Sequence, residues 1–486
     1  INRNAMFGYK HLNVPGRITQ PMLKQDGKFV PVSFEEALNI ITDRIRLVEA
    51  DENAFFGGAR LSNEELYLVQ KLARAGAGTN NVSSFHYMGR GEGYFHNSLA
   101  NAGFDEIAGA SKIYVIGAEF HFDHPVVNHL IFNAKHRKNI EVVHITTKEN
   151  TLFSEKADRV IRCANYFWFA QAVNHYIVSN GLQNSLFIND RTSDYEAWSA
   201  DILRHDFCQL CHKAGVTPEL VTAFATEYNE EMNAMLIFQE KEISANASVS
   251  LHQLTMVTGK LGKTSNGLIA LKETNNAHGI FDMGVCHKIG PGTVPILDET
   301  LQEKMGNIWG VNDLPFTVNS VYKHFTGGRI KNAFIFGEDP IGCALDPVEV
   351  KQWFNRLNFL VVQDFTLTET AQKADLILPA SFLWESGGSY TNTIKQIGWV
   401  DAQIACPSEM SGFDQLSALL RNFGLNTASN PAEIMCEIAS LLPKPDETAL
   451  YPFIVKDNDN YNRQFNFGCD ALVKGIEEEV KVALGN

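Results

Sequence analysis

Short apolar runs recur along the chain, and each is followed by a polar turn and a segment with helical spacing. Runs this short that are apolar on both faces are typical of strands covered by helices on both sides of a sheet. Their alternation with helices predicts mainly parallel sheets and an α/β fold. The predicted strands are KIYVIG (112–117), IEVVHI (140–145), NAMLIFQ (233–239), NAFIFG (332–337), NFLVVQD (358–364) and ADLILPA (374–380).

Capping residues mark several helix starts. Ser62 and Glu65 form a capping box ahead of an apolar-periodic segment. Three further starts place a cap residue directly before a proline, which suits the first helical position. These are Thr217–Pro218, Asp346–Pro347 and Asn430–Pro431.

Length and charge narrow the class of protein. A chain of 486 residues predicts two or three domains, or one discontinuous pair. The net charge of -15 opposes binding to nucleic acid or to an anionic membrane surface, because the summed field repels phosphate. No apolar run reaches the roughly 18 residues of a membrane span. We therefore expect no direct membrane insertion and no nucleic-acid partner.

The first residues and the cysteines suggest a compartment. The start INRNAMFGYK lacks the charged and apolar regions of a secretory signal, and it lacks a starting Met, so we expect a fragment or a processed chain. Most of the eight cysteines stand inside apolar segments, which predicts buried thiols in a reducing compartment. We expect a cytoplasmic protein, peripheral to the inner membrane only through partner subunits.

Two local motifs offer metal or haem ligands. Cys208, Cys211 and His212 match C-x-x-C-H, the attachment signature of a c-type haem, but the pattern over 194–215 predicts one helix with two packed thiols. HFDHPVVNH places His121, Asp123, His124 and His129 directly after a strand, where α/β sheets bind ligands. Its spacing is not that of a common metal site, so loop and cap hydrogen bonding is the alternative.

Two glycine-rich loops are candidates for ligand binding. Gly89, Gly91 and Gly93 fit neither a P-loop nor a dinucleotide-binding fingerprint, and a tight turn explains them equally well. Residues 363–393 read as strand, turn, short helix, strand and a loop rich in hydroxyls and amides. Such donors and acceptors at strand ends suit a ligand with phosphates and hydroxyls, but they also cap helices and close turns.

Nearly the whole chain resembles the molybdopterin oxidoreductase family, which includes formate dehydrogenases and the large peripheral subunit of NADH:quinone oxidoreductase (complex I). The segments that carry the resemblance occur in the family's order. They are FGYKHLNVPGRITQPM, NEELYLVQKLARAGAGTNNV, DHPVVNHLIFNAKHRK, MVTGKLGKTSNGLIALKETNNAHGIFDMG, FIFGEDP and QDFTLTETAQKADLILPASF with GGSYTNT.

The resemblance implies two Rossmann-like domains, one inserted in the other, without the C-terminal barrel domain of the catalytic relatives. The implied limits are 1–9 for a remnant of an iron-sulfur domain junction, 10–83 plus 276–486 for a discontinuous α/β domain, and 84–275 for the inserted one. In catalytic relatives a Cys, selenocysteine or Ser ligates molybdenum or tungsten next to a His. Here those positions fall on Gly89 and Arg90, and glycine has no donor atom.

Other departures agree with a lost metal site. Asn2, Asn4 and Ala5 replace the last cluster Cys and the Lys–Gly that follow it, and Lys272 replaces an Arg of formate-oxidising members. Positions resembling pterin-nucleotide contacts remain, and these are Gly337, Glu338, Asp339, Pro340, Asp364, Thr368, Glu369, Thr370, Asp375 and Asn392.

These features lead to one main hypothesis and two alternatives. We expect no metal and no cofactor in this chain, and iron-sulfur clusters only in a missing N-terminal segment. We expect a scaffold role among the subunits of a complex I-type NADH dehydrogenase or a related electron-transfer complex. One alternative is an active formate dehydrogenase with molybdenum or tungsten on molybdopterin guanine dinucleotide, with His86, Arg90 and Lys272 near the substrate. The other is a protein-interaction module with no redox role.

Overall fold

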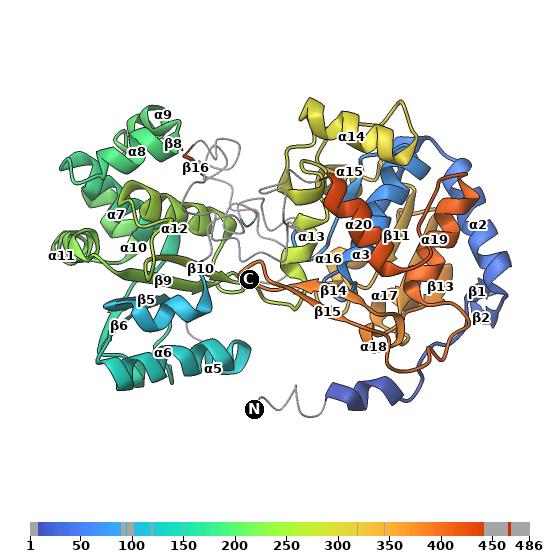
Figure 1. Ribbon diagram of the computed structural model, residues 1–486, viewed down its shortest axis with the longest axis horizontal. Coiled ribbons are helices and arrows are strands. Elements are labelled where there is room, and N and C mark those ends of the chain that lie inside the picture. Colours follow the sequence, from blue (N-terminus) through green and yellow to red (C-terminus); the bar gives the residue numbers. More distant parts are fainter. Residues whose placement is uncertain are drawn as a thin grey trace.

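Two lobes make up the part of the chain that the computed structural model describes (Figure 1). The described residues are 8–88, 94, 102–117, 120–149, 151–317, 319–344, 346–441 and 465–467. One lobe is built on a seven-stranded sheet and the other on a five-stranded sheet. None of the helices formed by these residues combines the length and the apolar composition that crossing a bilayer requires.

The seven-stranded sheet takes strands from both ends of the described chain. Its order is β2 (Lys28–Pro31), β1 (Met22–Gln25), β13 (Leu376–Pro379), β12 (Phe359–Asp364), β11 (Asn332–Phe336), β3 (Asn53–Gly57) and β4 (Val82–Ser83). Strand β1 pairs antiparallel with β2 and β13, and all other pairs are parallel. The predicted strands β11, β12 and β13 are confirmed.

The five-stranded sheet is parallel throughout and is formed by the middle of the chain. Its order is β10 (Gly267–Leu271), β9 (Ala234–Gln239), β5 (Lys112–Ile116), β6 (Glu141–Thr146) and β7 (Arg159–Arg162). Because every pair is parallel, all five carboxyl ends lie at one edge. The two sheets confirm the predicted α/β fold, and the domain limits given above stay a prediction.

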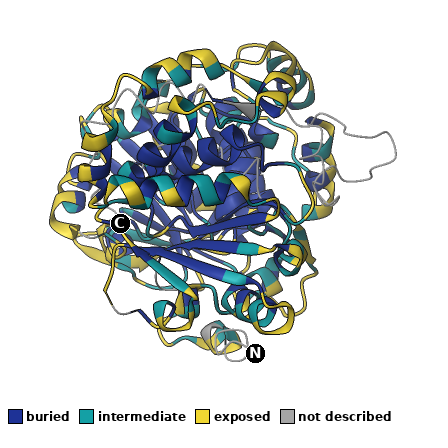
Figure 2. Cartoon of the chain, turned by 90° about the vertical axis from the view of Figure 1, so that its left-hand side faces the viewer, coloured by how far each residue is buried: buried dark blue, intermediate teal, exposed yellow. Residues whose placement is uncertain are grey.

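Helices cover both faces of each sheet, so the central strands are buried on both sides (Figure 2), whereas β1, β2 and β7 are partly exposed. In the seven-stranded sheet, Phe334 pairs with Phe55 on the neighbouring strand, and their rings stack with centroids 4.8 Å apart. These rings face helices α2, α3, α14 and α19, whereas the alternate residue Ile335 packs on the side of α16. Full burial of one such side chain contributes about 1.5–3 kcal/mol, so the alternation decides which face each helix covers.

Several helices begin at residues whose side chains cap the first turn. Ser62 and Glu65 form the predicted capping box of α3, and Thr217 and Asp346 accept hydrogen bonds from the first turns of α11 and α16. The longer helices are α2 (Phe34–Arg46), α3 (Asn63–Lys71), α6 (Pro125–Lys138), α7 (Tyr166–Ser179), α8 (Ser185–Arg191), α9 (Tyr195–Ile202), α10 (Phe207–Ala214), α11 (Pro218–Glu230), α12 (Ala245–Val257), α14 (Glu299–Trp309), α16 (Pro347–Phe354), α19 (Gly412–Asn422) and α20 (Pro431–Leu441). Shorter helices are α5 (Phe120–Asp123), α13 (Ala277–Asp282), α15 (Val321–Thr326), α17 (Glu369–Lys373) and α18 (Leu383–Ser386). Segments of 3₁₀ helix are Gly8–Asn13, Ala50–Glu52, Phe104–Gly109, Ser154–Lys156 and Pro291–Thr293, and Leu72–Gly76 is a π-helical segment directly after α3.

A hairpin of β14 (Gly388–Thr391) and β15 (Ile397–Val400) reaches from the seven-stranded lobe toward the other lobe (Figure 1). Asn63, at the start of α3, donates from its side-chain amide to the hydroxyls of Ser389 and Thr391, each at 3.0 Å. The Thr391 N–H donates to the Asn276 side chain at 2.8 Å. Helix α3 and the segment before α13 therefore fix the hairpin. A second small pairing joins β8 (Thr192–Ser193) to β16 (Phe465–Asn466).

Candidate functional site

The carboxyl ends of β3, β11 and β12 bring several predicted residues together. Asp364 ends β12, and Gly337 follows β11. Arg60, just after β3, donates from its two Nη atoms to the Asp364 carboxylate at 2.9 and 3.2 Å, and from Nε to the Gly337 carbonyl at 2.9 Å. Asp364 is 1% exposed, whereas the Arg60 side chain is 41% exposed. This edge therefore presents a cation that a buried carboxylate holds in place.

Glu338 joins the segment after β4 to the same edge. Its carboxylate accepts hydrogen bonds from the Ser84 hydroxyl and from the N–H groups of Phe85 and His86, the latter two at 3.0 and 3.2 Å. Burial raises the pKa of Glu338 above its ordinary value, although the three donors act in the opposite direction. Glu338 thus positions residues 84–86, while the buried Pro340 follows two residues later.

Asp339, Thr368 and Thr370 hold the loops at this edge to one another. The Asp339 carboxylate accepts from the Thr370 N–H at 3.0 Å and from the Thr370 hydroxyl at 2.6 Å. The Thr368 hydroxyl donates to Asp364 at 3.0 Å, and the same side chain caps α17. Glu369 forms an exposed ion pair with Lys351 at 2.9 Å. Most of these polar side chains therefore bond to other residues at this edge of the sheet.

Asp375 and Asn392 lie apart from this group. Asp375 accepts from the N–H of Leu360 at 2.8 Å, at the amino end of β12 and so at the opposite edge of the sheet. Asn392 stands in the turn between β14 and β15, where its side-chain oxygen accepts from the N–H groups of Ile394 and Gln396 at 3.0 and 2.9 Å. The ten predicted nucleotide contacts therefore do not form one surface.

A buried ion pair lies where the two lobes meet. Lys272 follows β10, and its ammonium donates to the Glu240 carboxylate at 2.7 Å and to the Tyr94 carbonyl at 3.3 Å. Both side chains of the pair are 2% exposed. The ammonium also lies 5.7 Å from the ring centroids of Tyr87 and Phe281, which stack on each other with centroids 4.1 Å apart. The carboxyl ends of β9 and β10 thus meet aromatic residues that lie outside the five-stranded sheet.

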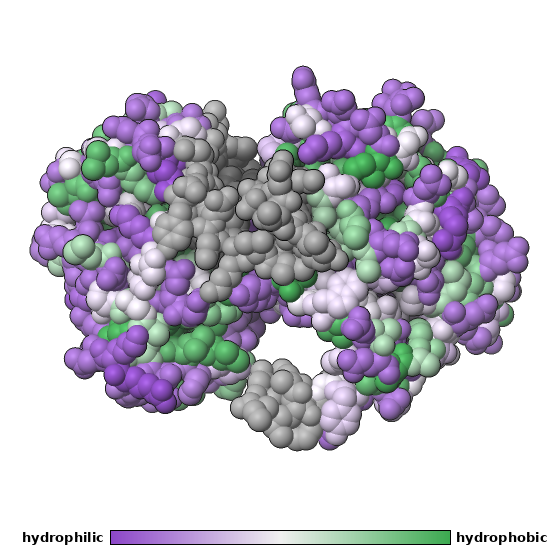
Figure 3. All heavy atoms as spheres, viewed as in Figure 1, coloured by the Kyte–Doolittle hydropathy of each residue, from purple (hydrophilic) through white to green (hydrophobic). Residues whose placement is uncertain are grey.

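The predicted residue His86 reaches the same region. Its ring lies edge-on to that of Tyr87, with centroids 4.5 Å apart, so Tyr87 contacts both His86 and Lys272. Gly89 and Arg90, the two positions of the degenerate metal site, lie outside the described residues. In the space-filling view, an opening separates part of the two lobes (Figure 3).

Residues 17–410 match the family model described as molybdopterin oxidoreductase. The chain belongs to the molybdopterin oxidoreductase family. The family inferred from the sequence motifs is therefore confirmed, together with the fold class.

Relatives within the molybdopterin oxidoreductase family include formate dehydrogenase subunits. The F420-dependent formate dehydrogenase 2 subunit alpha of Methanococcus maripaludis is 27% identical over 457 residues, which are 90% of this chain and 67% of the relative. The F420-dependent formate dehydrogenase subunit alpha of Methanocaldococcus jannaschii is 28% identical over 420 residues, covering 83% of this chain and 61% of the relative. This chain thus spans about two thirds of these relatives' length.

A solved structure supports the fold alone. Acetylene hydratase from Pelobacter acetylenicus has a TM-score of 0.67 to this chain at 13% identity, covering 96% of this chain and 68% of that one.

On the sequence motifs, the family's metal-ligand position falls on a glycine outside the described residues. The ligand position inferred from the motifs is Gly89, which has no side-chain donor. Within the described ranges, no group of three or more His, Cys, Asp or Glu side chains is arranged to hold a metal ion. At the edge of the seven-stranded sheet, the carboxylates that could contact a nucleotide already accept internal hydrogen bonds.

The HFDHPVVNH motif spans α5 and the first turns of α6, with His121 in α5 and His129 in α6. His124 is the N-cap residue of α6 but makes no side-chain capping bond, and burial lowers its pKa to about 4. Asp123 pairs with Lys241 at 3.1 Å. The cap hydrogen bond predicted as the alternative is therefore absent at His124.

The single helix predicted over 194–215 is wrong. The chain forms α9 and α10 with a break between them, because Asp206 accepts from the Gln209 N–H at 2.8 Å and starts a new helix. Cys211 is buried as predicted, but Cys208 is exposed. Cys343 and Cys436 are also exposed, so the expectation of buried cysteines holds only in part.

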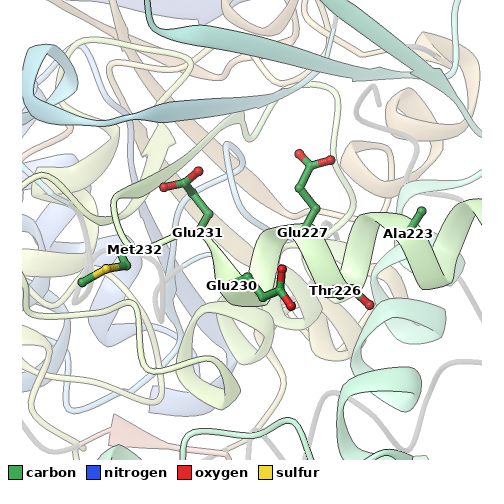
Figure 4. Close-up of a pocket in the computed structure, with 6 residues that line it drawn as sticks. All are labelled: Ala223, Thr226, Glu227, Glu230, Glu231 and Met232. Carbon is green, nitrogen blue, oxygen red and sulfur yellow. The ribbon is translucent and has the colours of Figure 1, made fainter.

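An open hollow on α11 (Figure 4) contains none of the residues of the candidate site. Glu227, Glu231 and Met232 line it just before the amino end of β9, whereas ligands of open α/β sheets bind at carboxyl ends. Glu227 already accepts two hydrogen bonds of 2.6 Å from Arg159. We do not assign this hollow to the candidate site.

Sequence reasoning missed Arg60 and Glu240, which complete the two ion pairs of the site. Each is a charged residue just beyond an apolar strand run, AFFGG before Ala59–Arg60 and MLIFQ before Glu240. A search for charged residues at strand ends would have found both.

Proposed function

We propose that this chain is a scaffold subunit of an electron-transfer complex, built on the molybdopterin oxidoreductase fold and without a catalytic metal of its own. The observation that carries the proposal is the neutralised Lys272 ammonium, which Glu240 pairs at 2.7 Å. A cation that recognises an anionic substrate has to remain available to it. Here the Glu240 carboxylate already pairs with the Lys272 ammonium.

The residue at the inferred metal-ligand position supports the same proposal. Gly89 supplies no sulfur or oxygen donor, whereas the family resemblance implies a Cys, selenocysteine or Ser ligand of the metal at this position in catalytic relatives. The alpha subunits among the relatives belong, by their names, to formate dehydrogenases with more than one subunit. We accordingly propose partner subunits for this chain, in a complex of the NADH dehydrogenase or formate dehydrogenase type, with iron-sulfur clusters on a segment preceding it.

The proposed domain arrangement follows the two sheets. We propose that 10–83 with 276–486 forms one domain and that 84–275 is inserted in it. Strands 22–83 and 332–379 share one sheet, and strands 112–271 share the other, which supports this division.

The second candidate is an active formate dehydrogenase that holds molybdenum or tungsten through pterin nucleotides alone. The names of the relatives favour it, since both are formate dehydrogenase subunits at 27% and 28% identity. In that case His86, Arg90 and Lys272 would be the residues nearest the substrate.

Elemental analysis of the purified complex separates the two candidates. The chain is expressed with its native neighbours in a host that loads a known molybdenum enzyme of the same fold, which serves as the positive control. We expect molybdenum and tungsten far below one ion per chain, no pterin released by oxidation, and no formate-dependent dye reduction. One metal ion per chain together with formate oxidation would establish the second candidate. Purification of the chain alone, without flavin or iron-sulfur subunits, would count against the scaffold role.

A further inference from the structure

Cys208 and Cys211 form a thiol pair that the proposed scaffold role does not use. They lie three residues apart in α10, and both are free cysteines. On a regular helix, residues at this spacing have Cα atoms about 5 Å apart. The Cα atoms of disulfide-bonded cysteines lie about 4.4–6.8 Å apart. The helix backbone therefore brings the two thiols within reach of each other.

The two thiols differ in exposure. Cys208 is exposed in the first turn of α10, whereas Cys211 is 1% exposed. Leu210, Cys211 and Ala214 belong to the core of the five-stranded lobe, where α10 packs against α7. Burial raises the pKa of Cys211 to about 11, and the neighbouring Cys208 acts in the same direction. An accessible thiol thus stands beside a protected one.

The packing of α10 keeps the second thiol protected. Near the start of the helix, the Phe207 ring stacks on the His175 ring of α7, with centroids 5.7 Å apart. At the other end, the Ala214 carbonyl accepts from the Ala164 N–H at 2.7 Å. Cys211 lies between these two anchored ends. A reagent in solution therefore meets only the first thiol while the helix stays packed.

We propose that Cys208 and Cys211 are a redox-active dithiol that exchanges with small-molecule disulfides. The Cys208 thiolate attacks one sulfur of the disulfide, so a mixed disulfide forms and one small thiolate leaves. The Cys211 thiol then loses its proton to water and attacks the Cys208 sulfur. This step forms the Cys208–Cys211 bond and releases the second small thiolate. The protein loses two electrons and two protons, and the small disulfide gains them as two thiols.

The helical geometry makes the resulting disulfide easy to reduce. Residues at this spacing on a helix have Cβ atoms about 5–6 Å apart. In a disulfide the Cβ atoms lie about 3.8 Å apart, so closing the bond distorts the first turns of α10. A distorted disulfide has a higher reduction potential, and we expect the dithiol to be the resting state when reduced thiols are in excess. The site uses neither the metal-ligand position nor the two ion pairs, so its failure would leave the scaffold proposal intact.

Mass spectrometry of the full chain tests the proposal. Trypsin cleaves after Arg204 and Lys213, so both cysteines fall in one peptide. The folded chain is equilibrated with mixtures of reduced and oxidised glutathione, quenched with acid and alkylated before digestion. We expect an oxidised peptide that has lost two hydrogen atoms and resists alkylation, with less than about a tenth of it as the glutathione adduct. A wild-type peptide that stays a dithiol, or that accumulates as the glutathione adduct, would overturn the proposal.

Two variants separate the roles of the thiols. Cys211→Ala should accumulate the glutathione adduct at Cys208 at least about tenfold above the wild type, because no intramolecular attack displaces it. Cys208→Ser should leave Cys211 unmodified. Equal adduct levels at Cys208 in the wild type and Cys211→Ala, or an adduct at Cys211 in folded Cys208→Ser, would refute the inference.

Cys436 provides a matched control on another helix. It is exposed in α20 and has no other cysteine within four residues on either side. Its glutathione adduct should therefore reach the same level in the wild type and in both variants. The wild-type measurement needs no substitution, so it decides the question even if Cys211→Ala does not fold.

Discussion

Replacing Glu64 with glutamine tests how the hairpin between the lobes is held. Glu64 is buried in the first turn of α3, and its carboxylate accepts from the Ser389 N–H at 2.9 Å and from the Ser389 hydroxyl at 2.7 Å. Burial raises the pKa of Glu64 from 4.5 to about 7, although both Ser389 hydrogen bonds act to lower it. The folded protein therefore favours the protonated carboxyl, which a glutamine side chain resembles.

The sign and size of the effect follow from linkage. A carboxyl whose pKa is raised by folding contributes stability below pH 4.5, and this contribution is lost as the pH rises through about 7. The difference between 4.5 and about 7 corresponds to about 3 kcal/mol in the free energy of unfolding. Buried histidines such as His287, whose pKa is lowered to about 4 by burial, act with the opposite sign at acid pH. Only the difference between wild type and variant isolates Glu64.

Urea unfolding of wild type and Glu64→Gln between pH 5 and pH 8.5 measures this difference. We expect nearly equal stability at the acid end, and a variant more stable by up to about 3 kcal/mol at the alkaline end. Glu303→Gln, an exposed position on α14, serves as the control and should leave the pH profile unchanged. A difference between Glu64→Gln and wild type that stays constant from pH 5 to 8.5 would refute the reasoning.

Three further predictions concern the ion pairs and the core. Arg60→Ala leaves buried Asp364 without its bidentate partner and should lower the free energy of unfolding by about 1–3 kcal/mol in urea, whereas the exposed Arg204→Ala should have no measurable effect. Phe334→Ala creates a cavity in the seven-stranded lobe and should cost about 3–5 kcal/mol, and a loss below 1 kcal/mol would contradict its packing. Two cations lower the pKa of Glu227 to about 2 against the effect of burial, so its stabilisation is lost as the pH falls from 4.5 toward 2. Glu227→Gln should therefore weaken the dependence of stability on pH in acid, with unfolding followed by circular dichroism. An unchanged midpoint of acid unfolding would contradict this.

Much of the local structure was predictable because its causes are close in sequence. Ser62 and Glu65 bond to each other across one helical turn, and the apolar runs at 332–337 and 358–364 specify buried strands without reference to distant residues. Where two local signals compete, the prediction failed. Apolar spacing over 194–215 suggested one helix, but the Asp206 cap divides it.

The sequence alone determined the α/β class, most strands, several helix starts and the family, since these depend on short-range patterns and on ordered motifs. Only the tertiary structure decided which charges meet. Arg60 reaches Asp364 across 304 positions, and Lys272 reaches Glu240 across 32, because sheet order and register bring their strand ends together. Both cations are paired with carboxylates, but the Arg60 side chain is 41% exposed and that of Lys272 is 2% exposed. The physical reason is that the free energy of a charged side chain depends on its neighbours in space. The packing of the whole chain determines those neighbours.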